Sequence, residues 1–146
     1  MNHLAYHPFF ASFPLCAFIT AFLLELLYGS RSQTTVRFLQ LFGSAMVVLA
    51  FLTGYIASSY ASKTFLIPEE DIALHHRVGK VVLVGALLLP PLGFMKSHIV
   101  KMKVGFNVFY WVVFLALVGA LVLAGYLGAY LVFIDGAGVI GASRLN

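Results

Sequence analysis

The sequence predicts an all-α protein whose four helices span a membrane as one bundle. Of its 146 residues, 62% are hydrophobic and only 10% are charged, and the mean hydropathy is +1.00. About a quarter of the residues in an ordinary soluble domain are charged, so this composition excludes that class. Four apolar stretches each reach the roughly 20 residues that a helix needs to cross about 30 Å of hydrocarbon. Helices satisfy their own backbone hydrogen bonds in lipid.

The predicted helices leave no residues for a separate soluble domain, so residues 1–146 form one membrane domain. The helices cover about 8–28, 35–60, 72–95 and 104–134. Consecutive spans run in opposite directions, and the starts of the first and third spans therefore lie at the same membrane face.

Prolines and acidic residues mark the first and third helices. Pro8 fits a first helical turn, where its missing N–H has no cost, and Pro14 should kink the first helix. Pro90 and Pro91 should break or bend the third helix near its end. Three acids stand beside the positive end of the third helix dipole: Glu69, Glu70 and Asp71.

Two features inside the spans concern packing and charge. A stripe of small residues at spacing four in the fourth span predicts close helix contact, within the bundle or in a homodimer. Its members are Ala116, Ala120, Ala124 and Gly128. Glu25 lies near the far end of the first span, where we expect it to reach toward Arg31 or Arg37 rather than to serve proton transport.

The distribution of Lys and Arg predicts that both termini lie on the outer, extracytoplasmic side of the membrane. One set of loops carries Arg31, Arg37, Lys96, Lys101 and Lys103. The opposite face carries Lys63, Arg77, Lys80 and Arg144. The first set lies in very short loops, and the N-terminal tail has no Lys or Arg, so the positive-inside rule places the first set in the cytoplasm.

The histidines form the main candidate site. His7 opens the first span and the adjacent pair His75 and His76 opens the third, so they meet at one face. Imidazole is a standard axial ligand of haem iron and a common metal ligand. His7 with His75 or His76 could therefore hold one haem b between the two helices.

Other residues near these histidines are of the types that a haem would need. Gly79, four residues after His75, would let a flat group approach the backbone. Cations and hydroxyls for the haem propionates could come from Arg77, Lys80, Tyr55 and Tyr126. The plainer interpretation of these tyrosines is an interfacial aromatic belt, and the pocket-lining role is the alternative.

One further histidine lies too far away to join this site, and two alternatives to haem binding remain open. His98 follows His75 by 23 residues, or roughly 34 Å of helix, and cannot join the same site. A copper or zinc site would need three or four ligands, which His3, His7, His75 and His76 could supply, with Glu70 or Asp71 nearby. The histidines could also be ordinary interfacial residues of a cofactor-free accessory subunit.

Conventional enzyme chemistry and nucleic-acid binding are not indicated. The sequence has no nucleophile with a plausible base, no phosphate-binding Gly loop and no zinc-protease motif. The net charge of +4 is spread over short loops and is explained by membrane orientation. A membrane oxidoreductase or electron-transfer component, with a redox protein or a quinone as its partner, is the expected class.

The segment HPFFASFP at residues 7–14, together with Glu25, resembles the bacterial membrane family known as domain of unknown function 2231. Thr53 and Gly54, and the Gly-rich ending at residues 125–139, extend this resemblance over nearly the whole chain. It implies a four-helix fold in a bacterial inner membrane and no established activity. Many members of that family carry a histidine where this chain has Ser12.

A looser likeness concerns b-type membrane cytochromes, including the diheme ascorbate-reducing type. It depends on the segment LHHRVGK at residues 74–80 and on the Gly-Tyr pair in the last span. Those cytochromes have two histidine pairs at two depths, whereas this chain has one. The likeness therefore implies a single haem.

Overall fold

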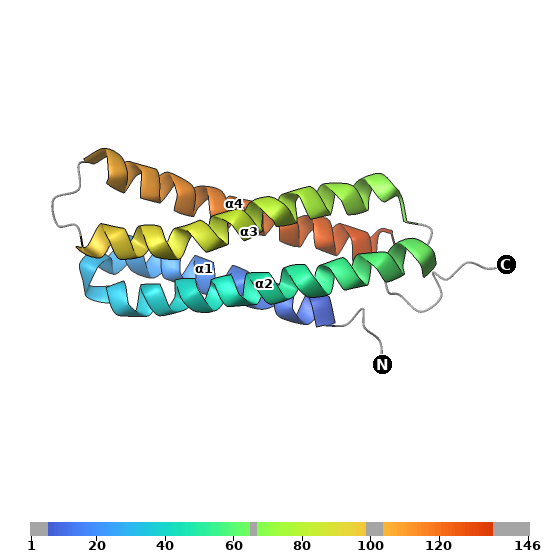
Figure 1. Ribbon diagram of the computed structural model, residues 1–146, viewed down its shortest axis with the longest axis horizontal. Coiled ribbons are helices and arrows are strands. Elements are labelled where there is room, and N and C mark those ends of the chain that lie inside the picture. Colours follow the sequence, from blue (N-terminus) through green and yellow to red (C-terminus); the bar gives the residue numbers. More distant parts are fainter. Residues whose placement is uncertain (1–5, 65–66, 99–103, 136–146) are drawn as a thin grey trace.

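The protein is a bundle of four long helices, as the sequence predicts (Figure 1). The computed structural model describes residues 6–64, 67–98 and 104–135. The helices are α1 (Tyr6–Tyr28), α2 (Gln33–Thr64), α3 (Glu69–His98) and α4 (Val104–Phe133), with a short 3₁₀ turn, η2 (Gly29–Ser32), between the first two. His3 and the side chain of His98 lie outside the described residues.

Each helix is long and apolar enough to cross a membrane. The candidate spans are His7–Tyr28, Gln33–Ser59, Glu69–Lys96 and Val104–Phe133. Large apolar side chains point outward along all four helices, as expected where lipid replaces water around a bundle. The chain is therefore a multi-pass membrane protein with four candidate spans.

The two middle helices are longer at both ends than the predicted ranges 35–60 and 72–95. At the start of α3, the Pro68 carbonyl accepts hydrogen bonds from the backbone N–H groups of Asp71 and Ile72. The three acids therefore lie within the first turn rather than before it. At the start of α2, the chain enters the helix directly from η2.

Of the predicted break or bend at Pro90 and Pro91, the break does not occur, because α3 continues through both residues. A proline at position 90 leaves the carbonyl of Ala86, four residues earlier, without its usual helical donor. The Ser44 hydroxyl of α2 donates to this carbonyl over 2.6 Å and also to the Gln40 carbonyl over 2.7 Å. A neighbouring helix thus supplies the donor that the proline removes.

Aromatic side chains fill the core in the half of the bundle where α1 ends and α4 begins, which we call the Glu25 end. Phe18 is fully buried and lies over Gly43, where a Cβ atom would come within 2.8 Å of its ring. Phe22 of α1 meets Trp111 and Phe114 of α4 edge-on, with ring centroids 5.6 and 5.3 Å apart. These contacts close the seam between α1 and α4 at this end.

Phe114→Ala should destabilise the bundle strongly, because Phe114 is 0% exposed and its ring also contacts Tyr110 and Trp111. Loss of a buried Phe ring costs about 3 to 5 kcal/mol. The neighbouring Leu115 is 61% exposed, so Leu115→Ala should change stability by no more than about 0.5 kcal/mol. Reversible unfolding in detergent, followed by circular dichroism, compares the two variants. Equal losses would contradict this placement of the core.

Candidate functional site

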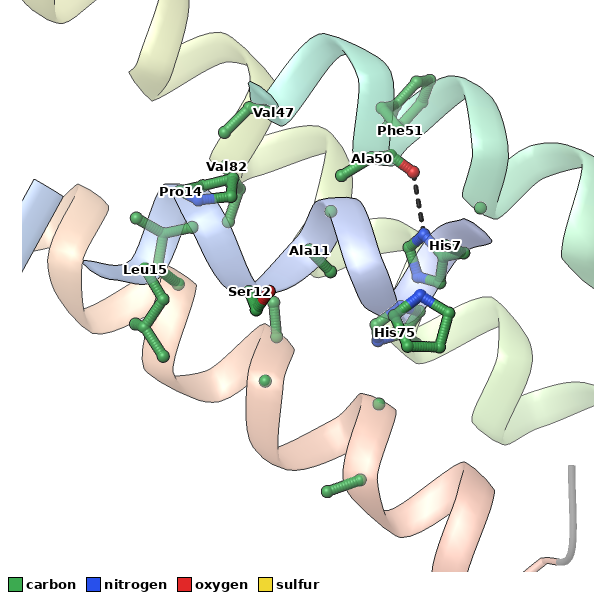
Figure 2. A pocket seen from close by; sticks show the side chains of 18 of the residues that line it. His7, Ala11, Ser12, Pro14, Leu15, Val47, Ala50, Phe51, His75 and Val82 are labelled. Atoms are coloured by element: carbon green, nitrogen blue, oxygen red, sulfur yellow. Dashed lines mark hydrogen bonds between the residues drawn. The ribbon is translucent and has the colours of Figure 1, made fainter. Parts of the chain in front are cut away.

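A cavity of about 450 Å³ lies among the four helices at the opposite end, which we call the histidine end (Figure 2). Its walls are almost entirely apolar, and small residues make much of the lining: Gly54, Gly79, Ala124, Gly125, Gly128 and Ala129. Small side chains keep the helix backbones close to the enclosed space. His7, His75 and His76 lie on this lining, together with the phenol of Tyr55.

His7 is held by a backbone carbonyl of the adjacent helix. Its Nδ1 lies 2.8 Å from the Ala50 carbonyl oxygen of α2, as the dashed line in Figure 2 marks. A carbonyl can only accept, so Nδ1 carries the proton and Nε2 keeps its lone pair. The ring lies against Gly54, where a Cβ atom would come within 2.8 Å of Cε1. The sequence places His7 at a helix start and gives no sign of Ala50 as its partner.

His75 faces His7 from α3. The two ring centroids are 5.9 Å apart and the rings stand at 80° to each other. The His75 ring packs on α4 at Gly128, where a Cβ atom would lie 3.3 Å from Cε1. Its Nδ1 is buried near the Ala124 carbonyl without a hydrogen bond of normal geometry. His76 is farther along, with its centroid 6.5 Å from that of His75.

This arrangement brings two imidazoles from separate helices within reach of one metal centre. Each metal–nitrogen bond would be about 2 Å long, which suits rings at this spacing. Among the residues that the structure describes, no group of three or more His, Cys, Asp or Glu side chains is arranged to hold a metal ion. A copper or zinc site with three or four protein ligands would therefore require His3, which is not among them.

The structure brings some predicted site residues together and leaves others apart. Tyr55, His76 and Gly79 line the cavity with His7 and His75. Arg77, Lys80 and Tyr126 are exposed and absent from its lining. The expected propionate partners on α3 and α4 therefore do not reach the enclosed space.

The small-residue stripe of α4 faces the bundle interior for most of its length. Ala120 and Ala124 pack against the core, and Gly128 accommodates the His75 ring. Ala116 is exposed. The stripe thus serves contact within the bundle and the shape of the cavity, and the homodimer stays a prediction.

From the exposed residues of its lining, we infer that the cavity has a sideways opening between α1 and α4. Several of its lining residues on these two helices are exposed: Ala11, Ser12, Gly125 and Ala129. They all lie inside the candidate spans, so the opening faces the lipid-exposed side of the bundle. The aromatic contacts that close this seam at the Glu25 end have no counterpart among these small residues.

A second polar group lies at the Glu25 end, and it corrects the expected partner of Glu25. The carboxylate accepts a hydrogen bond from Lys96 of α3 over 2.8 Å and another from the Tyr110 hydroxyl of α4. Gln40 of α2 donates from Nε2 to the Tyr110 oxygen over 2.8 Å. Glu25 is 8% exposed, so it points inward to these residues instead of outward to Arg31 or Arg37. We call Glu25, Gln40, Lys96 and Tyr110 the Glu25 cluster.

Gly54→Ala should displace the His7 ring, because the new Cβ atom would lie 2.8 Å from Cε1 and 2.9 Å from Nδ1. Overpacking of this kind costs roughly 1 to 3 kcal/mol and would strain the bond to Ala50. Gly79→Ala is the matched control, because a Cβ atom there meets nothing within 4 Å. Thermal unfolding in detergent should show a loss for Gly54→Ala alone. A loss of the same size in Gly79→Ala would show that the effect is not specific to the His7 contact.

The chain matches no protein-family model, no curated protein and no solved structure. The resemblance to the membrane family and the likeness to b-type cytochromes therefore stay predictions. The function therefore has to be inferred from the geometry of the histidine cavity and of the Glu25 cluster.

Proposed function

We propose that this chain is a small membrane haem protein that holds one haem b between His7 of α1 and His75 of α3 and takes part in one-electron transfer. The observation that carries the proposal is the meeting of these two rings, 5.9 Å apart, in a largely apolar cavity. Haem bound there would supply an iron centre that gains and loses single electrons.

The cavity and its histidines suit a flat apolar macrocycle. A volume of about 450 Å³ lies within the range of cofactor and ligand sites. Gly79 of α3 and Gly125 of α4 line it, and a Cβ atom at either would meet nothing within 4 Å, so a planar group can come close to both backbones. The bond from His7 Nδ1 to the Ala50 carbonyl leaves Nε2 as the nitrogen with a free lone pair. Metal-binding histidines are oriented by such outer hydrogen bonds.

His75 is the better second ligand than His76. It lies in direct ring contact with His7, whereas His76 lies beyond it along α3. We further propose that the histidine end faces outward from a bacterial inner membrane, in keeping with the positive residues of the opposite loops.

Protein purified from cells supplied with haem should be red and show a Soret band. His7→Ala and His75→Ala should each abolish the band, because either change removes an axial ligand, while His76→Ala should retain it. Absorption spectroscopy together with iron, copper and zinc analysis provides the measurement. A colourless protein with zinc or copper would favour the metal-binding alternative, and one without any metal would favour an accessory subunit.

The opening between α1 and α4 makes the lipid phase the natural route into the cavity. Ala129 lies on the α4 edge of this opening. Ala129→Phe should slow the uptake of haem from haem-loaded vesicles at least several-fold, because a bulky ring would obstruct the edge. Stopped-flow absorbance at the Soret band measures the rate.

Ala116→Phe is the matched control, because Ala116 is exposed on the same helix and does not line the cavity. It should load at the rate of the unmodified protein. Equal rates in both variants and the unmodified protein would rule out this entry route while leaving haem binding itself intact.

A further inference from the structure

The Glu25 cluster joins all four helices through a directed chain of hydrogen bonds. Gln40 Nε2 donates to Tyr110, Tyr110 donates to Glu25, and Lys96 donates to the other oxygen of the same carboxylate. The chain is formed with Glu25 ionised, because both Glu25 oxygens accept. An ionisable residue inside a membrane span is expensive to maintain and commonly marks function.

One atom of this cluster is unsatisfied. Gln40 is 0% exposed, and its Oε1 has no hydrogen-bond partner among the described residues. A buried acceptor without a donor is costly, and few occur in natural proteins. Gln40 Oε1 is therefore an unused hydrogen-bond acceptor on the amide that contacts the Tyr110 hydroxyl.

This unused acceptor allows the series of hydrogen bonds between Gln40, Tyr110 and Glu25 to reverse its direction. If Glu25 takes up a proton, its O–H can donate to the Tyr110 oxygen, and the Tyr110 O–H can turn to donate to Gln40. This requires the Gln40 amide to rotate so that Oε1 faces Tyr110. Nε2 then becomes the unsatisfied atom in place of Oε1, so the two directions have similar numbers of unmade bonds.

Gly93 of α3 provides the space for this amide. A Cβ atom at position 93 would come within 2.8 Å of Gln40 Oε1 and within 3.6 Å of the Tyr110 ring. Any larger residue would press on the amide in its present orientation. A half-turn of the amide exchanges the positions of Oε1 and Nε2, so the space beside Gly93 that holds Oε1 would hold Nε2 after the reversal.

We propose that Glu25 is a proton-exchange site, with Tyr110 and Gln40 as a relay whose hydrogen bonds reverse when Glu25 is protonated. The ligand is a proton from the aqueous phase at the Glu25 end, where Lys96 is 23% exposed and α1 ends at Tyr28. The carboxylate gains an O–H bond on protonation, and no electron moves. The proposal does not depend on haem binding at the other end.

Two of the charged and titratable groups at this end contact Glu25 directly, and two others lie on neighbouring elements. Lys96 of α3 pairs with it directly, and the Lys96 ammonium also lies 4.4 Å from the centre of the Tyr110 ring and 4.9 Å from that of Trp111. Tyr110 is the contact from α4. Arg31 of η2 and Arg37 of α2 lie at the same end, and Arg37 stacks over Phe94. Lys96 is therefore the cation that pairs with the Glu25 carboxylate.

Infrared difference spectroscopy between acidic and neutral pH tests the proposal on the full chain in lipid nanodiscs. Only five Asp and Glu residues contribute, so subtraction of the Glu25→Gln spectrum isolates the C=O band of protonated Glu25. We expect such a band, accompanied by changes in the tyrosine C–O and glutamine amide bands. The absence of a Glu25 band would overturn the proposal.

Lys96→Met should increase the protonated Glu25 band at neutral pH, because an unpaired carboxylate in this setting takes up a proton. Lys96→Arg should restore the pattern of the unmodified protein. Circular dichroism confirms that each variant is folded. A carboxylate that stays ionised at neutral pH in a folded Lys96→Met protein would contradict the assigned role of Lys96.

Gly93→Ala tests the relay. It should keep the Glu25 band but reduce the tyrosine and amide changes, because the Cβ atom obstructs the Gln40 amide. Gly119→Ala, where a Cβ atom meets nothing within 4 Å, should retain all three signals. Glu25 protonation without tyrosine or amide changes in the unmodified protein would overturn the relay, as would equal signals in both glycine variants.

Discussion

The structure depends on one constraint, which is that a polar group inside a lipid-embedded bundle must find its partner within the protein. Water is absent from the hydrocarbon region, so an unpaired donor or acceptor has its full desolvation cost. The carbonyl freed by Pro90 illustrates how the bundle meets this constraint, because Ser44 reaches across from α2 to bond it. The bond from His7 to the Ala50 carbonyl is a second example.

Glycine makes these inter-helix polar contacts possible. Gly54 accommodates His7, Gly128 accommodates His75, and Gly93 accommodates the Gln40 amide. In each case a polar side chain from one helix occupies the space that a Cβ atom on another helix would take. Small residues in this chain therefore do more than let backbones approach, since they also define where polar groups sit between the helices.

The sequence predicts the four helices and the shared depth of His7 and His75, because span length, hydropathy and alternating direction are local or topological properties. It does not predict partners that depend on helix rotation. Glu25 lies 71 positions from Lys96 and 85 from Tyr110, and Arg31 and Arg37 are nearer along the chain. The helix faces that meet are set by side-chain packing across the whole bundle. For the same reason, the exposure of Arg77, Lys80 and Tyr126 could not be read from their spacing.

The bundle separates two kinds of polar site by an apolar middle. Val47 and Val82 line the base of the histidine cavity and also belong to the core, whereas Ser44 and Gln40 lie one and two turns along α2 toward the other end. A cofactor that changes its charge in the cavity would therefore act on the Glu25 cluster through a thin layer of low dielectric, where charges interact more strongly than in water. Electron transfer at one end and proton uptake at the other would then favour each other, because a negative charge gained in the cavity stabilises a proton on Glu25. If the cavity holds such a cofactor, this field would be the physical link between the two sites.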